Sequence, residues 1–299
     1  MFSSVIDAAC FDSLSQLGPW GRLLGFCIAL VYFACFESRI GGGQTVGKRW
    51  LKLRVVDRNG YAVSFGRAIV RYAIFAIPLF LNQIDIPTTR TPLILSFLIS
   101  LVVFGVGGST LYLMVFNRST RQGLHDLAVG AYVTKADDTG QMEVKPIPRA
   151  HWAAVGLVFA LTTAAWTFSN MLEKRAPFHQ MRQDAFFIEQ MDGVQRARVL
   201  DTLSHSGTGG EAKKVLLVSV ILTKKTANEE AFADNAARIL LQKDRNAQEY
   251  DELSVRIFRG YDMGIGTRWN HEEFAHTPVE WRQRVLGASP GQTPSSTHQ

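Results

Sequence analysis

Long uncharged stretches dominate the first half of the chain and predict helices that cross a membrane. A span through a hydrocarbon core of about 30 Å needs about 20 largely apolar residues. Residues 91–117 hold 27 positions without a charge, and residues 152–172 hold 21 more. Trp152 and Trp166 can anchor the second stretch at the two interfaces. We therefore predict one transmembrane helix over each stretch.

Two shorter stretches predict further spans, each with an arginine near one end. Residues 23–36 hold 14 uncharged positions and become long enough when residues 18–22 join them. Residues 72–84 hold 13 and contain a proline, so this span has to begin near Ala68 and include Arg71. A long arginine side chain in such a position can reach the headgroups. The pattern thus predicts a polytopic α-helical membrane domain with about four transmembrane helices.

The spacing of apolar positions after residue 172 is typical of a soluble domain. A connecting helix is predicted over residues 177–191, and Thr226 begins a capping box that opens a second helix. The other predicted elements are strands over 194–203 and 215–222, a hairpin of 253–258 and 263–269 joined through 260–262, and a helix that starts at 277. The order α-β-β-α-β-β-α predicts an α+β sandwich with helices on one face of an antiparallel sheet.

These patterns divide the chain into five parts. Residues 1–19 are predicted to form an amphipathic or re-entrant segment, and residues 20–150 a membrane domain with three spans and cytoplasmic strands. A fourth transmembrane helix covers residues 151–172, a periplasmic α+β domain covers 173–286, and a disordered tail rich in Ser, Thr, Pro and Gly covers 287–299.

The distribution of charge predicts how the chain is oriented. The first 172 residues hold 15 Lys and Arg against 9 Asp and Glu, whereas the remaining residues hold 17 of each. The basic residues gather in the segments 39–67 and 118–149, while the loop 82–91 carries only Arg90 and residues 1–19 carry none. Because basic loops stay in the cytoplasm, both termini are predicted to be periplasmic in a bacterial inner membrane. The expected partners are anionic lipid at the cytoplasmic face and a periplasmic protein, and no nucleic acid.

The predicted cytoplasmic segments carry the most distinctive motifs of the chain. The first is Gly-Gly-Gln-Thr-Val-Gly-Lys-Arg, which includes Gly42, Gly43, Gln44, Thr45, Gly47, Lys48 and Arg49. A Leu-Arg-Val-Val strand follows, and after the third span come Leu124, His125, Asp126 and Leu127. In this order the chain resembles the RDD family of polytopic membrane proteins. The resemblance covers residues 18–135 and assigns no family to the rest of the chain.

The resemblance implies which charged residues matter, but it implies two different functions. The family is known by one Arg and two Asp; Arg22 looks like the Arg and Asp126 like the second Asp. Ala29 stands where the first Asp would fall. Some members are associated with cation/proton exchange and others with the assembly of membrane complexes. The missing acid disfavours exchange, because an intramembrane carboxylate is the natural carrier of a proton or cation.

The motifs can also be interpreted without any ligand. The glycines let the chain turn away from the end of a helix. Apolar and basic residues alternate over residues 51–55, which predicts a half-buried strand. We expect this strand to pair with residues 131–134. Gly42 to Lys48 also fits the phosphate-binding pattern G-x-x-x-x-G-K. Arg49 occupies the position where a Ser or Thr should reach magnesium, and a membrane helix precedes the loop where a strand is needed. Nucleotide binding is therefore a remote alternative.

Arg71 needs a charged partner if it faces the interior of the helices. By topology the nearby acids are Asp126, Glu37 and Asp85. We expect Asp126 to form a structural ion pair with Arg22 or Arg71, and a transport site built from the same three residues is the alternative.

The C-terminal module shows no pattern of a catalytic, cofactor or metal site. His271 and His276 are five residues apart, which is not the spacing that places two imidazoles on one helix face. We therefore expect a non-enzymatic membrane protein that displays a periplasmic module for an envelope partner. A cation/proton exchanger is the alternative, and an envelope hydrolase remains a remote option.

Overall fold

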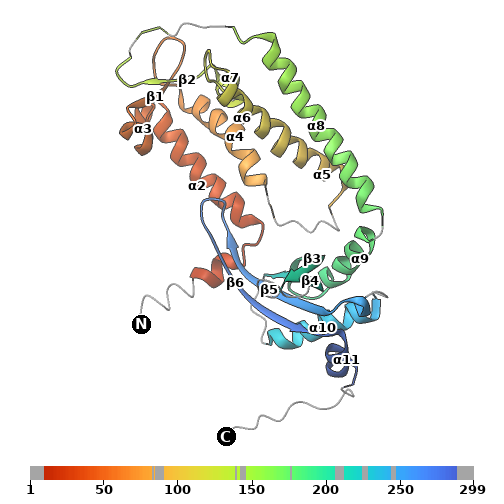
Figure 1. Ribbon diagram of the computed structural model, residues 1–299. Coiled ribbons are helices and arrows are strands. Elements are labelled where there is room, and N and C mark those ends of the chain that lie inside the picture. Colours follow the sequence, from red (N-terminus) through yellow and green to blue (C-terminus); the bar gives the residue numbers. More distant parts are fainter. Residues whose placement is uncertain are drawn as a thin grey trace.

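The computed structural model describes residues 10–82, 84, 91–138, 140–141, 146–175, 177–205, 212–223, 228–243 and 247–287. In Figure 1, four helical segments run side by side through the first half: α2 (Trp20–Glu37), α4 (Phe65–Leu81), the continuous run of α5 (Leu93–Ser100), η2 (Leu101–Val106) and α6 (Gly107–Phe116), and α8 (Arg149–Glu173). Helix α4 packs between α2 and α6, and α8 packs beside α6. This part, residues 20–173, is called the membrane domain.

Three of these segments are long and apolar enough to cross a membrane among the residues that the structure describes. They are α2 with 18 residues, the segment Leu93–Phe116 with 24, and α8 with 25. Helix α4 has 17 residues, which corresponds to about 26 Å. It begins at Phe65, before the predicted Ala68, because the Ser64 side chain accepts a hydrogen bond from the Arg67 N–H and caps the helix. The predicted number of four spans depends on α4.

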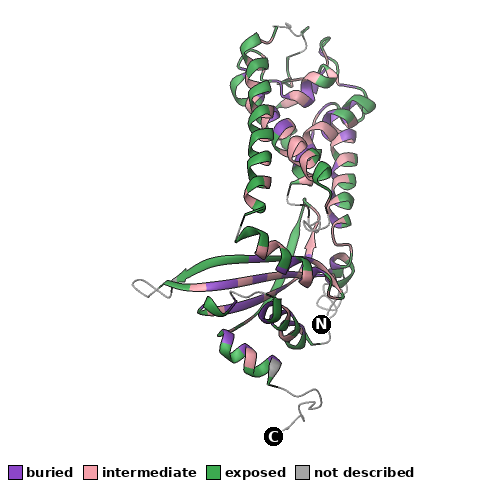
Figure 2. Cartoon of the chain, turned by 90° about the vertical axis from the view of Figure 1, so that its right-hand side faces the viewer, coloured by how far each residue is buried: buried purple, intermediate pink, exposed green. Residues whose placement is uncertain are grey.

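The outer surfaces of these helices are apolar and unpacked. Within α8, Val155 is the single buried residue, while large side chains such as Leu161 and Phe168 are about 60% exposed. Figure 2 shows exposed positions along much of the long helices, with buried positions more frequent near one end and in the sheet. So much exposed apolar surface is typical of helices that contact lipid.

One end of the membrane domain carries the small elements that the motifs form. These are η1 (Arg39–Gly41), α3 (Val46–Trp50), β1 (Leu53–Val56), α7 (Leu124–Val129) and β2 (Tyr132–Lys135). Strands β1 and β2 pair in the antiparallel direction, with Val55 opposite Val133, so the predicted pairing of the two segments is confirmed. We call this end the motif end and the opposite end the module end.

A four-stranded sheet and its helices form the module, residues 177–287, at the other end (Figure 1). Its elements are α9 (Phe178–Glu189), β3 (Val194–His205), β4 (Ala212–Leu222), α10 (Glu229–Lys243), η3 (Ala247–Glu249), β5 (Glu252–Asp262), β6 (Thr267–His276) and α11 (Pro278–Leu286). The sheet order is β3-β4-β5-β6. Its core contains Ile188, Leu240 and Trp281 from the helices together with Val218 and Val255 from the strands.

The sheet is mixed, and the predicted antiparallel sheet is wrong at one pair. Strands β4 and β5 are parallel, with Val218 opposite Val255. Helix α10 lies between them in sequence and carries the chain back along the sheet, which makes the next strand run in the same direction.

The turn of the β5–β6 hairpin also lies later than predicted. Both strands extend further, so the connection spans residues 263–266, where Gly264 has a φ of 74°. The prediction places Gly260 in the turn, but the structure places it inside β5. A Cβ there would come within 2.1 Å of the Arg268 carbonyl oxygen, so glycine permits a close approach of the two strands.

The described part of the N-terminal segment lies against this hairpin. Residues 10–15 are helical, and the buried Phe11 ring is 6.1 Å from the ring of Tyr261. Residues 1–9 and 288–299 lie outside the described residues, as does Thr226. The Asn228 side chain accepts a hydrogen bond from the Ala231 N–H at 3.0 Å, so Asn228 caps α10.

Candidate functional site

A buried group of charged residues joins the elements of the motif end. The Arg71 Nε donates to Asp126 Oδ1 at 2.7 Å, and its Nη1 donates to Glu37 Oε2. The Lys48 Nζ donates to the other oxygen of Glu37, and His125 Nε2 lies 3.4 Å from Asp126 Oδ2. We call these five residues the charge cluster.

Local structure places each member of the charge cluster. Glu37 is the last residue of α2, and Arg71 lies in the second turn of α4. Lys48 lies in α3, and its N–H donates to the Thr45 side chain, which caps that helix. Asp126 is in the first turn of α7, where its Oδ2 accepts from the Gly123 N–H at 3.3 Å. The cluster therefore connects four helices, α2, α3, α4 and α7.

The charges of the cluster balance, and its carboxylates are fully engaged. Glu37, Arg71 and Asp126 are each less than 10% exposed. Two carboxylates face two cations, and each of the four carboxylate oxygens has a polar neighbour within the cluster or at Gly123. Removal of one member of such a buried pair typically costs about 3–5 kcal/mol, because it leaves an unpaired charge. The arrangement can hold α2, α3, α4 and α7 together.

Burial also determines the charge of His125 in α7. Loss of water around the ring lowers the pKa of His125, an effect partly opposed by the nearby Asp126 carboxylate. The imidazole is therefore neutral at physiological pH. This leaves two positive and two negative charges in the cluster.

The glycine motif shapes the connection between α2 and β1. Gly43 has a φ of 77°, and a Cβ there would lie 2.5 Å from the Val55 carbonyl oxygen. The Val55 N–H donates to Gly43 at 2.8 Å, and the Gln44 amide donates to Leu53 at 2.9 Å. Only glycine fits this close, left-handed turn without strain. The motif thereby holds β1 against the end of α2 and places Lys48 next to Glu37.

The other motif residues have structural partners or lie at the surface. Gly42, with a φ of 71°, ends η1, and Arg49 donates to the Gly41 carbonyl at 3.3 Å. A Cβ on Gly47 would meet nothing within 4 Å, and Leu124 begins α7. The Lys48 side chain, which a phosphate-binding loop would direct to its ligand, is bound to Glu37. Helix α3 has five residues and follows a helix, so the geometry differs from that of a phosphate-binding loop.

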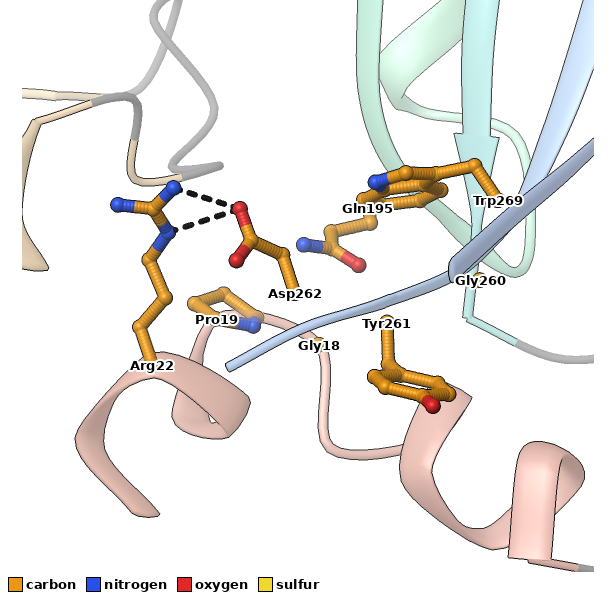
Figure 3. Close-up of a pocket in the computed structure, with 8 residues that line it drawn as sticks. All are labelled: Gly18, Pro19, Arg22, Gln195, Gly260, Tyr261, Asp262 and Trp269. Carbon is orange, nitrogen blue, oxygen red and sulfur yellow. Dashed lines mark hydrogen bonds and ion pairs between the residues drawn. The ribbon is translucent and has the colours of Figure 1, made fainter. Parts of the chain in front are cut away.

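Arg22 lies at the module end, far along α2 from Glu37. Its Nε and Nη2 donate to Asp262 Oδ2 at 3.1 and 2.5 Å (Figure 3). Its Nη1 donates to the carbonyl oxygens of Phe80, at 3.1 Å, and Asn82, at the end of α4. Of the two arginines considered as partners of Asp126, the structure pairs Arg71 with it and Arg22 with the module. Asp85 lies outside the described residues.

Helix α2 and the hairpin pack closely around this ion pair. A Cβ on Gly21 would lie 2.9 Å from the Asp262 carbonyl oxygen, and one on Gly25 would lie 1.9 Å from that of Met263. Figure 3 shows the surrounding cavity, which has a volume of about 10 Å³. That is at the lower limit for a single water molecule, so the junction is a packed interface between membrane domain and module.

Comparison with known proteins identifies the N-terminal half of the chain. Residues 10–130 match the model of the RDD family. These residues form an RDD domain. No curated protein and no solved structure matches the chain. The RDD domain contains the charge cluster and Arg22, and it ends before α8 and the module.

Within the RDD domain, the residues that resemble the family's charged positions do not meet. Arg22 and Asp126 bind different partners at opposite ends, as described above. Ala29, which stands where the resemblance would place the family's first Asp, is buried against Tyr72 and Ala76 of α4. At this position the chain therefore forms a contact between α2 and α4.

Two partners in these ion pairs were absent from the predicted site. Glu37 was considered only as one possible acid for Arg71, and its position at the end of an apolar stretch was the available signal. Asp262 lies 240 residues from Arg22, and no local pattern connects the two.

The described residues contain no group of three or more His, Cys, Asp or Glu side chains that could hold a metal ion. His271 and His276 both lie in β6. The first stacks on Phe258 at 5.5 Å, and the second packs edge-on against Trp281 at 4.8 Å. Both histidines thus have packing roles in the module.

Proposed function

We propose that this protein is a non-enzymatic inner-membrane protein of the RDD type, which holds a periplasmic module that binds or organises an envelope partner. The observation that carries this proposal is the closed charge cluster. Arg71 is held between Asp126 and Glu37, and Lys48 engages the remaining oxygen of Glu37. A group that is so completely paired is suited to fixing helices in place, and the second end of the same helices holds the module through Arg22 and Asp262.

The proposed orientation places the motif end in the cytoplasm. If α4 also spans the membrane, the four segments leave both described ends of the chain on the module side (Figure 1). Basic residues that surround the motif end are Arg39, Arg49, Lys52, Arg54, Arg58 and Arg67. Next to them, Val46, Trp50 and Leu51 of the α3 region are at least 65% exposed. Exposed apolar side chains beside basic ones favour contact with anionic lipid headgroups.

The module offers a surface for a protein partner. Its sheet ends in β3 and β6, whose outer edges can pair with a further strand. On β3, Leu200 and Leu203 are 48% and 64% exposed. An unpaired strand edge that carries exposed leucines can accept a strand of a partner protein. We propose that the partner binds along β3.

A photoreactive amino acid at position 203 tests this partner contact in cells that produce the full chain. We expect one reproducible crosslinked species, and no such species with the same group at the exposed Gln242 of α10. Deletion of residues 173–299 should cause the same phenotype as deletion of the whole gene. Absence of a specific crosslink at position 203, together with a normal phenotype after the deletion, would contradict the proposed role.

The second candidate function is cation/proton exchange through the membrane domain. It is favoured by one observation, which is that the titratable pair His125 and Asp126 is buried beside Arg71. Asp126→Asn in sealed vesicles separates the two functions. An exchanger would lose ion flux while folded protein remains in the membrane. In our proposal, the wild type shows no flux and the variant mainly lowers the amount of folded protein.

A further inference from the structure

An apolar cavity of about 480 Å³ lies between α2 and α4 at the module end. Its walls are built mainly from Trp20, Leu23 and Phe26 of α2 and Ile77, Phe80 and Leu81 of α4. An apolar cavity of about 150 Å³ can hold a benzene ring, so this one has room for a longer hydrocarbon. It differs from the small polar cavity around Asp262, although Arg22 and Pro19 border both.

The cavity opens on the surface of the helices that contacts lipid. Trp20, Leu23 and Ile77 line it and are 69%, 51% and 39% exposed. The exposed Val31 lies about three turns further along α2 on the same side as Trp20. Helix α2 has the length and apolar character of a membrane span. The hairpin covers its Gly21 and Gly25 side at this depth, while the exposed Trp20 and Leu23 lie on another side of the helix and are left to the acyl chains. The cavity is thus continuous with the lipid contact surface of the membrane domain.

The chemistry of the lining selects hydrocarbon over polar ligands. Arg22 is the charged side chain among the lining residues, and its N–H groups already donate to Asp262 and to backbone carbonyls of α4. Its charge is balanced by the Asp262 carboxylate at 2.5 Å. A phosphate would have to displace this carboxylate, and water in the cavity would lack the two to four polar partners that it needs.

We propose that one acyl chain of a bilayer phospholipid occupies this cavity. The chain enters from the surrounding leaflet between Trp20 and Ile77 and packs against Phe26 and Phe80. Phe80 also packs against the hairpin, since a Cβ on Gly264 would lie 2.7 Å from its ring. The bound chain therefore supports the same end of α4 to which Arg22 and the module are attached.

Photolabelling of the full-length protein in lipid vesicles tests this proposal. The vesicles contain phosphatidylethanolamine, phosphatidylglycerol and a phospholipid with a diazirine in its acyl chain, and mass spectrometry locates the labelled residues after digestion. We expect more label at the cavity walls than at lipid-exposed positions of α8, such as Leu161. Leu23→Trp fills the opening and should lower the labelling of Phe26 and Phe80 severalfold. The matched control Val31→Trp places the same ring on a lipid-facing site of α2 outside the cavity and should leave that labelling unchanged.

Equal labelling of the cavity walls and α8, or unchanged labelling in Leu23→Trp, would overturn the proposal. Gel filtration shows whether each variant is folded. If Leu23→Trp does not fold, Ile77→Trp fills the cavity from the opposite wall and is judged by the same criterion. Strong labelling of the walls that survives both filling substitutions would mean that the reactive chain reaches them by another route, and the cavity would not be its site.

Discussion

At the scale of single residues, the charge cluster is the feature on which the membrane domain depends most. Arg71 of α4 contacts Glu37 of α2 and Asp126 of α7. Lys48 of α3 binds Glu37 as well. Because all of these groups are withdrawn from water except part of Lys48, each depends on the others for its stabilisation. Loss of one charge should therefore affect the whole motif end.

Glu37→Gln should destabilise the protein strongly. The substitution leaves Arg71 and Lys48 with one carboxylate between them, and we expect a loss of about 3–5 kcal/mol of unfolding free energy. Thermal unfolding of the protein in detergent measures the change. The exposed Asp137 provides a matched control, since Asp137→Asn should shift the stability by no more than about 0.5 kcal/mol. A Glu37→Gln variant as stable as the control would contradict the structural role of the cluster.

His125 should make the stability depend on pH. Burial lowers its pKa in the folded protein below the ordinary value of about 6.5. The His125 side chain therefore binds a proton more readily in the unfolded chain than in the folded one. Its contribution to the free energy of unfolding is complete when the pH lies above the ordinary pKa of about 6.5, and it is lost as the pH falls below that pKa.

Unfolding temperatures measured between about pH 8 and pH 5 test this dependence on the His125 pKa. We expect the wild type to lose stability over that range and His125→Gln to lose less, because glutamine does not titrate. Parallel curves for the two proteins would show that His125 does not contribute to the dependence.

At the scale of elements, glycines determine where the membrane helices can contact other parts of the chain. Gly21 and Gly25 are one turn apart on α2, a spacing that usually brings two membrane helices together. Here the same surface receives the backbone of the β5–β6 hairpin. The contact fixes the hairpin next to Arg22 and thereby attaches the module.

Gly25→Leu should detach the hairpin from α2 while the membrane domain stays folded. A side chain there would overlap the Met263 carbonyl, and the backbone of the hairpin cannot yield without moving away. Hydrogen–deuterium exchange should show faster exchange in the hairpin and unchanged exchange in α7. Gly66→Ala in α4 is a suitable control, since its Cβ would meet nothing within 4 Å. A hairpin as protected in Gly25→Leu as in the control would show that this contact does not hold the module.

The elements also show which parts of the fold were predictable from sequence. Uncharged stretches and their flanking charges located α2, the Leu93–Phe116 segment and α8. This was possible because a helix that crosses a bilayer needs about 20 largely apolar residues, and such a stretch is visible in the sequence. Alternation and turn residues located the strands of the module. The parallel direction of β5 was missed because it depends on how α10 crosses the sheet, and the position of the hairpin turn was missed because Gly260 serves a close strand contact.

The candidate site was predictable only in part, for a similar reason. The Arg71 and Asp126 charges lie in or near apolar stretches, where a charge needs a partner, so they could be identified from the sequence. Which arginine meets Asp126 depends on the packing of α4 against α7, and the partner of Arg22 depends on the docking of the module. Neither arrangement leaves a local pattern in the sequence.

At the scale of the whole molecule, the RDD domain connects two surfaces at opposite ends of its helices. The motif end gathers basic residues around a buried cluster of charges, and the module end holds a mixed sheet through an arginine and two glycines. In our proposal the first surface faces the cytoplasm and the second faces the periplasm. Every proposed contact with an envelope partner depends on that orientation.

Paired fusions of alkaline phosphatase, which is active only outside the cytoplasm, test this orientation most directly. One fusion follows Gln299, and the other follows Asn59, in the turn after β1 at the motif end. We predict high phosphatase activity for the Gln299 fusion and background activity for the Asn59 fusion at equal protein levels. Background activity after Gln299 together with high activity after Asn59 would place the module in the cytoplasm and contradict the account.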